Sequence, residues 1–153
     1  MNAALAAWRR LEAKPFGKAL FSRAVCFKAP YFSSISPRFA ELGPGRARVS
    51  MRKRRSVQNH IGTVHAIAMC NLAEIAAGTV TEVSIPEGMR WLPKGMTVEY
   101  LRKAETDVEA TATLPGVEEG AARDVPVTVE VKDAAGELVC RAVITMWVTP
   151  RKK

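Results

Sequence analysis

Apolar residues at helical spacing predict two short helices at the start of the chain, one within residues 2–12 and a second that ends before Pro30. The spacing comes from Leu5, Trp8 and Leu11 in the first segment and from Phe16, Leu20 and Phe27 in the second. Both helices are expected to be peripheral. Pro and Gly at residues 43–45 then indicate a tight connection that leads into a strand.

That strand, residues 46–54, is predicted from strict alternation. The basic residues stand at even-numbered positions, namely Arg46, Arg48, Arg52 and Arg54. The apolar residues stand at the odd-numbered positions between them, namely Ala47, Val49 and Met51. One charged face and one apolar face are typical of a half-exposed strand.

Residues 64–79 follow a different pattern, because apolar or small residues occupy nearly every position around the helix. A helix of this kind is buried. Alternation returns in residues 89–103, 106–114, 125–131 and 138–148. These segments predict four successive antiparallel strands in a meander, with a hairpin connection at residues 133–136.

The order of elements predicts an α+β fold in which one sheet curls around the buried helix, since a flat layer could not cover that helix on most sides. Part of the cover could come from a second subunit. We divide the chain into peripheral helices at residues 1–30, a main domain at 31–149 and a basic tail at 150–153.

Length and composition agree with one globular domain: the chain has 153 residues, of which 48% are hydrophobic and 25% charged. The net charge of +8 favours an anionic partner such as a phosphate-bearing ligand, nucleic acid or a lipid surface. Three well-separated cysteines suggest reduced thiols in the cytoplasm and no metal site. We expect no export signal and no membrane span.

Two groups of polar residues stand out, one on the buried helix and one in the turn that precedes it. Asn71, Glu74 and Gly78 form a narrow stripe, and a carboxylate in such surroundings should have a raised pKa or lie at a cavity. The alternative is a solvated face or a salt bridge to an arginine. Upstream, residues 58–65 form a polar turn whose backbone N–H groups would receive an oxyanion at the helix N-terminus. Asn59 could add a donor, or could serve only as a turn residue.

At these residues the sequence resembles the hotdog-fold thioesterases of the phenylacetyl-CoA and 4-hydroxybenzoyl-CoA type, over about residues 33–149. In that family an Asn is followed after six residues by His-Gly-Gly, and nine residues after the His by an acid in the central helix. Asn59, His65 and Glu74 match this spacing. Ala66 and Ile67 replace the two glycines. Ala66 keeps the N–H, whereas Ile67 could narrow the pocket.

The resemblance implies an acyl-CoA thioesterase with its site at a dimer interface. Glu74 would act as general base or nucleophile, the Ala66 N–H would polarise the carbonyl with help from Asn59, and His65 would orient the site. Ala66 and Glu74 are eight residues apart, about 12 Å along a helix, so one helix cannot bring both to one carbonyl. A homodimer of antiparallel helices could, and two dimers could pair into a tetramer.

No cofactor is expected beyond coenzyme A as part of the substrate. The residues expected to contact substrate are Gly62, Ile67, Asn71, Arg90, Lys94, Arg102 and Lys103. Two alternatives on the same fold are a protein that binds acyl-CoA without turnover, favoured by the replaced glycines, and a dehydratase or hydratase with His65 as base. We do not expect nucleic-acid binding, because the aromatic residues do not cluster beside the basic run at residues 52–55.

Overall fold

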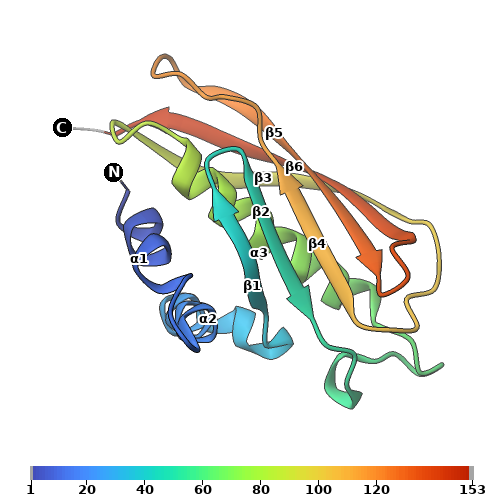
Figure 1. Cartoon of the computed structure of the whole chain (residues 1–153). Helices are drawn as coiled ribbons and strands as arrows, with labels where there is room; N and C mark the ends of the chain where they lie inside the picture. Colours follow the sequence, from blue (N-terminus) through green and yellow to red (C-terminus); the bar gives the residue numbers. More distant parts are fainter. Residues whose placement is uncertain (1, 152–153) are drawn as a thin grey trace.

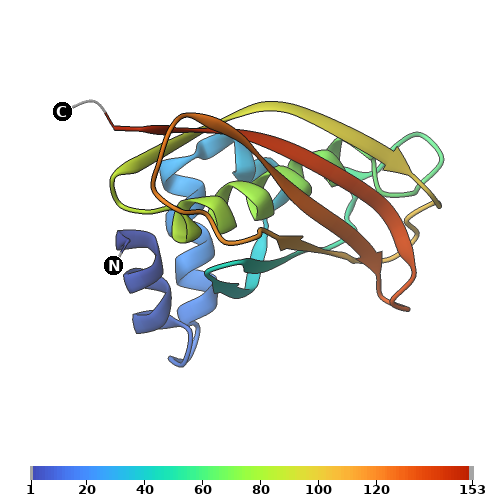
Figure 2. The same cartoon turned by 90° about the horizontal axis from the view of Figure 1, so that it is seen from above.

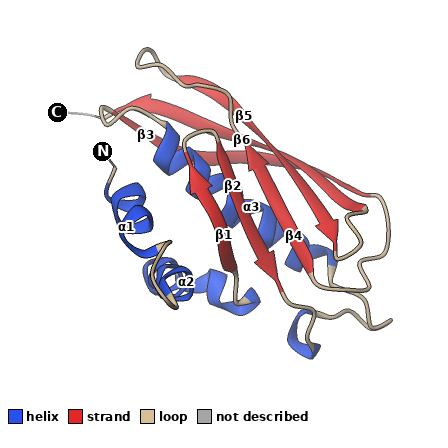
Figure 3. Ribbon diagram, in the orientation of Figure 1, coloured by secondary structure: helices blue, strands red, loops and turns tan. Residues whose placement is uncertain are grey.

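The structure of the chain, a computed structural model, describes residues 2–151 and consists of one antiparallel sheet curved around a long helix (Figures 1 and 3). The helices are α1 (Ala3–Leu11), α2 (Gly17–Lys28) and α3 (Ala66–Ser84), with two short 3-10 turns, η1 (Pro30–Ile35) and η2 (Arg55–Val57). The strands are β1 (Arg38–Gly43), β2 (Arg46–Met51), β3 (Met89–Tyr100), β4 (Val108–Thr113), β5 (Arg123–Asp133) and β6 (Leu138–Pro150). The predicted architecture is therefore confirmed.

The strands lie in the order β1-β2-β4-β5-β6-β3, so the predicted four-strand meander is wrong at its first member. β4, β5 and β6 do follow one another, but β3 pairs with β6 and lies at the sheet edge. The two longest strands, β3 and β6, pair from Met89 opposite Pro150 to Tyr100 opposite Cys140, with one shift of register between Pro93 and Gly95. Alternation along a strand indicates its faces but not its neighbours, which is why the crossover was missed.

β1 was not predicted as a strand. It forms a hairpin with β2 through a turn at Gly45, whose φ of +81° suits glycine. β2 ends at Met51, three residues earlier than expected, and buries Ala47 and Val49 together with Met51 as the alternation predicted.

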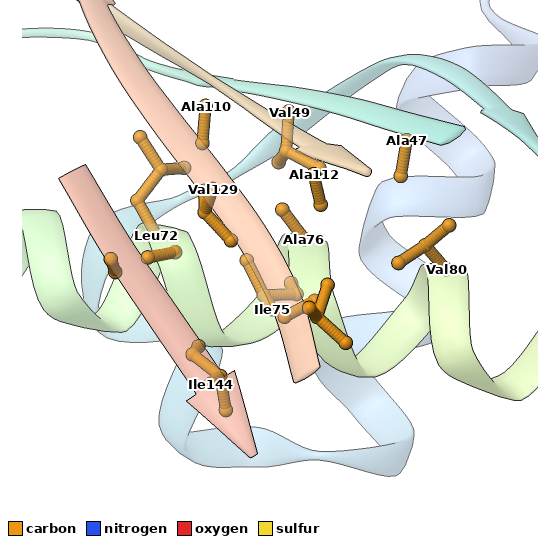
Figure 4. Packing of buried hydrophobic residues seen from close by; sticks show 14 of the residues in the cluster. Ala47, Val49, Leu72, Ile75, Ala76, Val80, Ala110, Ala112, Val129 and Ile144 are labelled. Atoms are coloured by element: carbon orange, nitrogen blue, oxygen red, sulfur yellow. The ribbon is translucent and has the colours of Figure 1, made fainter. Parts of the chain in front are cut away.

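α3 lies against the concave face of the sheet, where small side chains let it approach closely (Figure 4). Ala47, Ala110 and Ala112 from β2 and β4 meet the helix at Ala76 and Val80, all of them fully buried. Such close packing contributes roughly 25 cal/mol for each Å² of apolar surface removed from water. The helix continues five residues beyond the predicted end, to Ser84, and stops before Pro86.

α3 is also long and apolar enough, by length and composition, to cross a membrane. However, 61% of that stretch is buried inside the fold, and core helices of globular proteins pass the same test. Its apolar character is therefore accounted for by the sheet that surrounds it.

α1 and α2 pack side by side at the β1 edge of the sheet (Figure 2). Trp8, Phe21 and Phe39 join them to the sheet through ring contacts with centroids 5.1 to 6.3 Å apart. The second helix was predicted from Phe16, Leu20 and Phe27, but all three point to solvent and Phe21 supplies the contact.

At the other end of the chain, Arg151 is held by hydrogen bonds from its N–H to Gly88 O (2.8 Å) and from its Nε to Met89 O (2.9 Å). The remaining tail residues, Lys152 and Lys153, lie outside the described residues.

Candidate active site

The loop that enters α3 is organised by the side chain of Asn59. Its Oδ1 accepts hydrogen bonds from the backbone N–H groups of Ile61 (3.2 Å) and Thr63 (3.1 Å), and its Nδ2 donates to Thr63 Oγ1 (2.8 Å). Gly62 completes the turn with a φ of +78°. Asn59 and Gly62 therefore fix the shape of the loop from which the helix starts.

His65 is the N-cap of α3. Its Nδ1 accepts a hydrogen bond from the Ile67 N–H at 3.1 Å, so this nitrogen carries no proton in the capped arrangement. The His65 backbone N–H donates to Val57 O at 2.8 Å, and the ring itself is exposed. The neighbouring Val64 N–H donates to Ala104 O, also at 2.8 Å, which ties the loop to the segment after β3.

A cavity of about 490 Å³ opens at this helix start. It is lined by Asn59, Ile61, Thr63, Val64, Ala66, Met69, Tyr100, Leu101, Arg102, Lys103 and Ala104. Ala66 is the first residue of α3, and its N–H has no hydrogen-bond partner among residues 2–151. An unpaired donor at the positive end of a helix dipole favours a partly negative oxygen in the cavity.

Glu74 lies two turns further along α3 and does not line this cavity. It is half-buried and makes no hydrogen bond or ion pair with another described residue. One turn back, Asn71 is buried; its Nδ2 donates to Ser34 Oγ at 3.2 Å, but its Oδ1 has no partner in the part of the chain described. A buried acceptor without a partner costs about 1–3 kcal/mol, so water or a ligand is expected beside it.

Comparison with known proteins identifies the family. The profile of the domain of unknown function DUF4442 matches residues 17–148. The chain belongs to this family. No protein of curated function matches the sequence.

Among solved structures, this DUF4442 protein is similar to a structural-genomics protein described as genomics APC5556, with 47% identity, coverage of 97% of this chain and 98% of that one, and a TM-score of 0.84. It is also similar to thioesterase HI1161 from Haemophilus influenzae (17% identity, coverage 90% and 93%, TM-score 0.74). A thioesterase family protein from Silicibacter pomeroyi gives 20% identity, coverage 85% and 96%, and a TM-score of 0.72. Together with the sheet and helix described above, these matches show a thioesterase-like hotdog fold.

The DUF4442 protein brings four of the predicted site residues together at the cavity, namely Asn59, Ala66, Arg102 and Lys103. Gly62 belongs to the loop beside it, and Ile67 projects from the first turn of α3 with 57% of its surface exposed. Arg102 also pairs with Glu137 across 3.2 Å.

Arg90 and Lys94 are not brought to this cavity. Lys94 pairs with Asp124 (2.8 Å) and lies 5.0 Å from the ring centre of Trp147, on the face of the sheet opposite α3. Arg90 points to the same outer face, where its Nε donates to Thr149 Oγ1. Side chains alternate between the two faces of a strand, so neither cation reaches the cavity of its own subunit.

Tyr100 lines the cavity but was missed by sequence reasoning. Its hydroxyl lies 3.1 Å from Cys70 Sγ, and this hydrogen bond, followed by burial, raises the pKa of Tyr100 to about 12. The hydroxyl therefore stays protonated at neutral pH. Only the pairing of β3 with β6 places Tyr100 beside α3, and no local sequence signal carries that pairing. Within residues 2–151, no group of three His, Cys, Asp or Glu side chains is arranged to hold a metal ion.

Proposed function

We propose that this protein hydrolyses acyl-CoA thioesters at two equivalent sites in a homodimer, each built from the cavity of one subunit and Glu74 of the other. The observation that carries the proposal is that the Ala66 N–H, at the cavity, and the half-buried carboxylate of Glu74, two turns further along the helix, both lack a hydrogen-bond partner among the described residues. Two of the proteins similar in fold are described as thioesterases, which supports the same reaction class.

The cavity suits an acyl thioester in size and chemistry. Its volume of about 490 Å³ lies within the range of small-molecule sites. Val64, Met69 and Leu101 supply apolar walls for an acyl group, and Arg102 and Lys103 supply positive charge for the phosphates of coenzyme A. A free fatty acid could contact the apolar wall, but it has no phosphates to bind both Arg102 and Lys103.

The dimer follows from the distance between the two reacting groups. About 12 Å of helix separates Ala66 from Glu74, whereas a base and an oxyanion donor must each lie near 3 Å from their target atoms. β3 forms an open edge of the sheet, and Leu92 on it is exposed. An unpaired edge is a surface on which a second copy can add its own strand. A dimer of dimers would use further surface.

In the reaction, the Glu74 carboxylate of one subunit takes a proton from water as the water oxygen attacks the thioester carbonyl carbon. The carbonyl oxygen becomes an oxyanion that accepts from the Ala66 N–H of the other subunit. The C–S bond then breaks, the thiolate leaves with the proton held by Glu74, and a carboxylic acid remains. Direct attack by Glu74 through an anhydride is the other route to the same products.

The compartment proposed for this activity is the cytoplasm, because Cys26, Cys70 and Cys140 are all unpaired thiols. The second candidate function is binding of acyl-CoA without turnover. Ala66 and Ile67 favour it, because they replace the two glycines of the thioesterases that the sequence resembles.

The test is release of free thiol from a panel of acyl-CoA thioesters by wild type and by Glu74→Gln. Loss of a general base should lower kcat by about 10²–10⁴-fold. Glu82→Gln is the matched control, because Glu82 is the other carboxylate of α3 and accepts from Trp91 Nε1 at 2.7 Å. Thiol release unchanged in Glu74→Gln would remove Glu74 from the reaction, and binding without release would establish the second function.

A further inference from the structure

The second helix of the chain, α2, has apolar residues on two opposite faces. One face packs Gly17, Phe21 and Val25 toward the rest of the fold. The other carries Phe16, Leu20 and Phe27, spaced four and seven residues apart, so that they form one stripe. Only the first face is needed for folding.

The outer stripe is exposed far beyond what a core helix requires. Phe16 is 88% exposed, Phe27 91% and Leu20 58%, and Tyr31 in the following turn is 72% exposed. Scattered exposed apolar residues are ordinary, but three exposed aromatic rings and a leucine on one helix and the turn that follows it indicate an interaction surface. We call Phe16, Leu20, Phe27 and Tyr31 the aromatic stripe.

Phe16 also has an unfavourable backbone. Its φ of +59° lies in the left-handed region that favours glycine, yet a large aromatic residue occupies the position. The ring makes no buried contact that would compensate, because it projects into solvent. The presence of phenylalanine at position 16 is therefore better explained by a contact of its ring with a partner outside the chain than by the stability of the fold.

The charge around the stripe is strongly positive. Residues 2–38 contain seven Lys or Arg and a single acid, Glu12, and so hold a net +6 of the chain's +8. Lys14, Arg23, Lys28 and Arg38 have no ion-pair partner among the described residues. A groove of about 1020 Å³ runs beside the stripe, and Lys14, Lys18, Arg23 and Arg38 are among its lining residues, with Glu12 as its one acid.

From this combination we infer that the aromatic stripe and its surrounding cations dock the protein on an anionic lipid bilayer. Aromatic rings insert at the headgroup boundary while Lys and Arg contact anionic headgroups. A second copy of the chain fits this face poorly, because it would bring together two faces that carry unpaired cations of the same sign. The stripe lies at the β1 end of the sheet, so docking leaves the β3 edge free.

The test is flotation of the full chain with phosphatidylcholine vesicles, with and without phosphatidylglycerol. We expect binding only to the anionic vesicles, weakened by salt. Arg23→Glu should reduce the partition coefficient by at least about fivefold and Phe27→Ser by on the order of tenfold. Lys132→Glu and Val143→Ser on the outer face of β5 and β6 are the matched controls and should bind as wild type.

Phe16→Gly separates docking from folding. It removes the ring and relieves the left-handed backbone, so vesicle binding should fall while the melting temperature stays the same or rises. Hydrolysis of a short, water-soluble acyl-CoA should be unchanged in all stripe variants, so failure here is distinguishable from failure of the proposed activity. The inference would be overturned by equal binding to neutral vesicles, by no binding to either kind of vesicle, or by binding that survives Phe27→Ser combined with Arg23→Glu. If the protein bound an acidic protein and no vesicle, the face would be assigned to acidic protein partners instead.

Discussion

The indole ring of Trp91 lies directly over Gly78, so close that a Cβ built on the glycine would be 3.0 Å from Trp91 Cη2. The indole cannot retreat easily, because its Nε1 donates to Glu82 Oε2 at 2.7 Å and the other oxygen of Glu82 accepts from Asn2. This contact fixes how β3, the edge strand, sits against α3.

Gly78→Val should therefore lower the free energy of unfolding by about 1–3 kcal/mol, because the added methyl groups overpack the contact. Chemical denaturation gives the value. In a Trp91→Leu background the same substitution should cost measurably less, and an identical cost in both backgrounds would show that the two residues do not interact.

Ala66→Pro offers a selective deletion of the proposed oxyanion donor. Proline is well tolerated at the first position of a helix, and the ψ of 136° at His65 suits a residue that precedes proline. The variant should keep its stability but lose about 10²–10³-fold in kcat. Circular dichroism and thiol release measure the two effects.

Mixing Ala66→Pro with Glu74→Ala tests the shared site. A hybrid dimer would hold one intact site, with Glu74 from the first variant facing Ala66 of the second. After random exchange of subunits, about a quarter of wild-type activity should return. Light scattering of tagged subunits would show whether hybrid dimers have formed. If hybrids form and the mixture stays inactive, the site is not made from both chains.

His65 can be tested as a helix cap separately from its predicted role in orienting the site. His65→Ala should cost about 1 kcal/mol of stability because the Ile67 N–H loses its acceptor. His65→Asn keeps an acceptor at the N-cap and should restore that stability. If Asn also restores thiol release, His65 acts by capping alone; if it restores only the melting temperature, the imidazole has a further part in the reaction.

The Cys70 contact predicts the titration of Tyr100. In Tyr31→Phe, Tyr100 is the single tyrosine and its phenolate should appear with a pKa of about 12. Cys70→Ala removes the hydrogen bond that contributes most to the raised pKa of Tyr100, so this pKa should fall. Because the raised pKa belongs to the folded state, the contact stabilises the fold fully below pH 10, and this contribution is lost as the pH rises toward 12. Absorbance and unfolding midpoints across that range measure both effects.

The sequence by itself determined the elements whose cause is local. The all-round apolar pattern of α3 and the alternation in β2, β5 and β6 arise from which faces must be buried, and burial leaves a period in the sequence. The sequence also predicted the spacing of Asn59, His65 and Glu74 along one loop and one helix. It likewise predicted the distance of about 12 Å along the helix between Ala66 and Glu74.

Tertiary structure alone decided which strands are neighbours and which faces stay open. The pairing of β3 with β6 places Tyr100 at the cavity, because an alternating strand carries no record of its partner. The same holds for α2, where Phe21 and Phe27 look alike in sequence and only the position of β1 determines that one is buried and the other exposed.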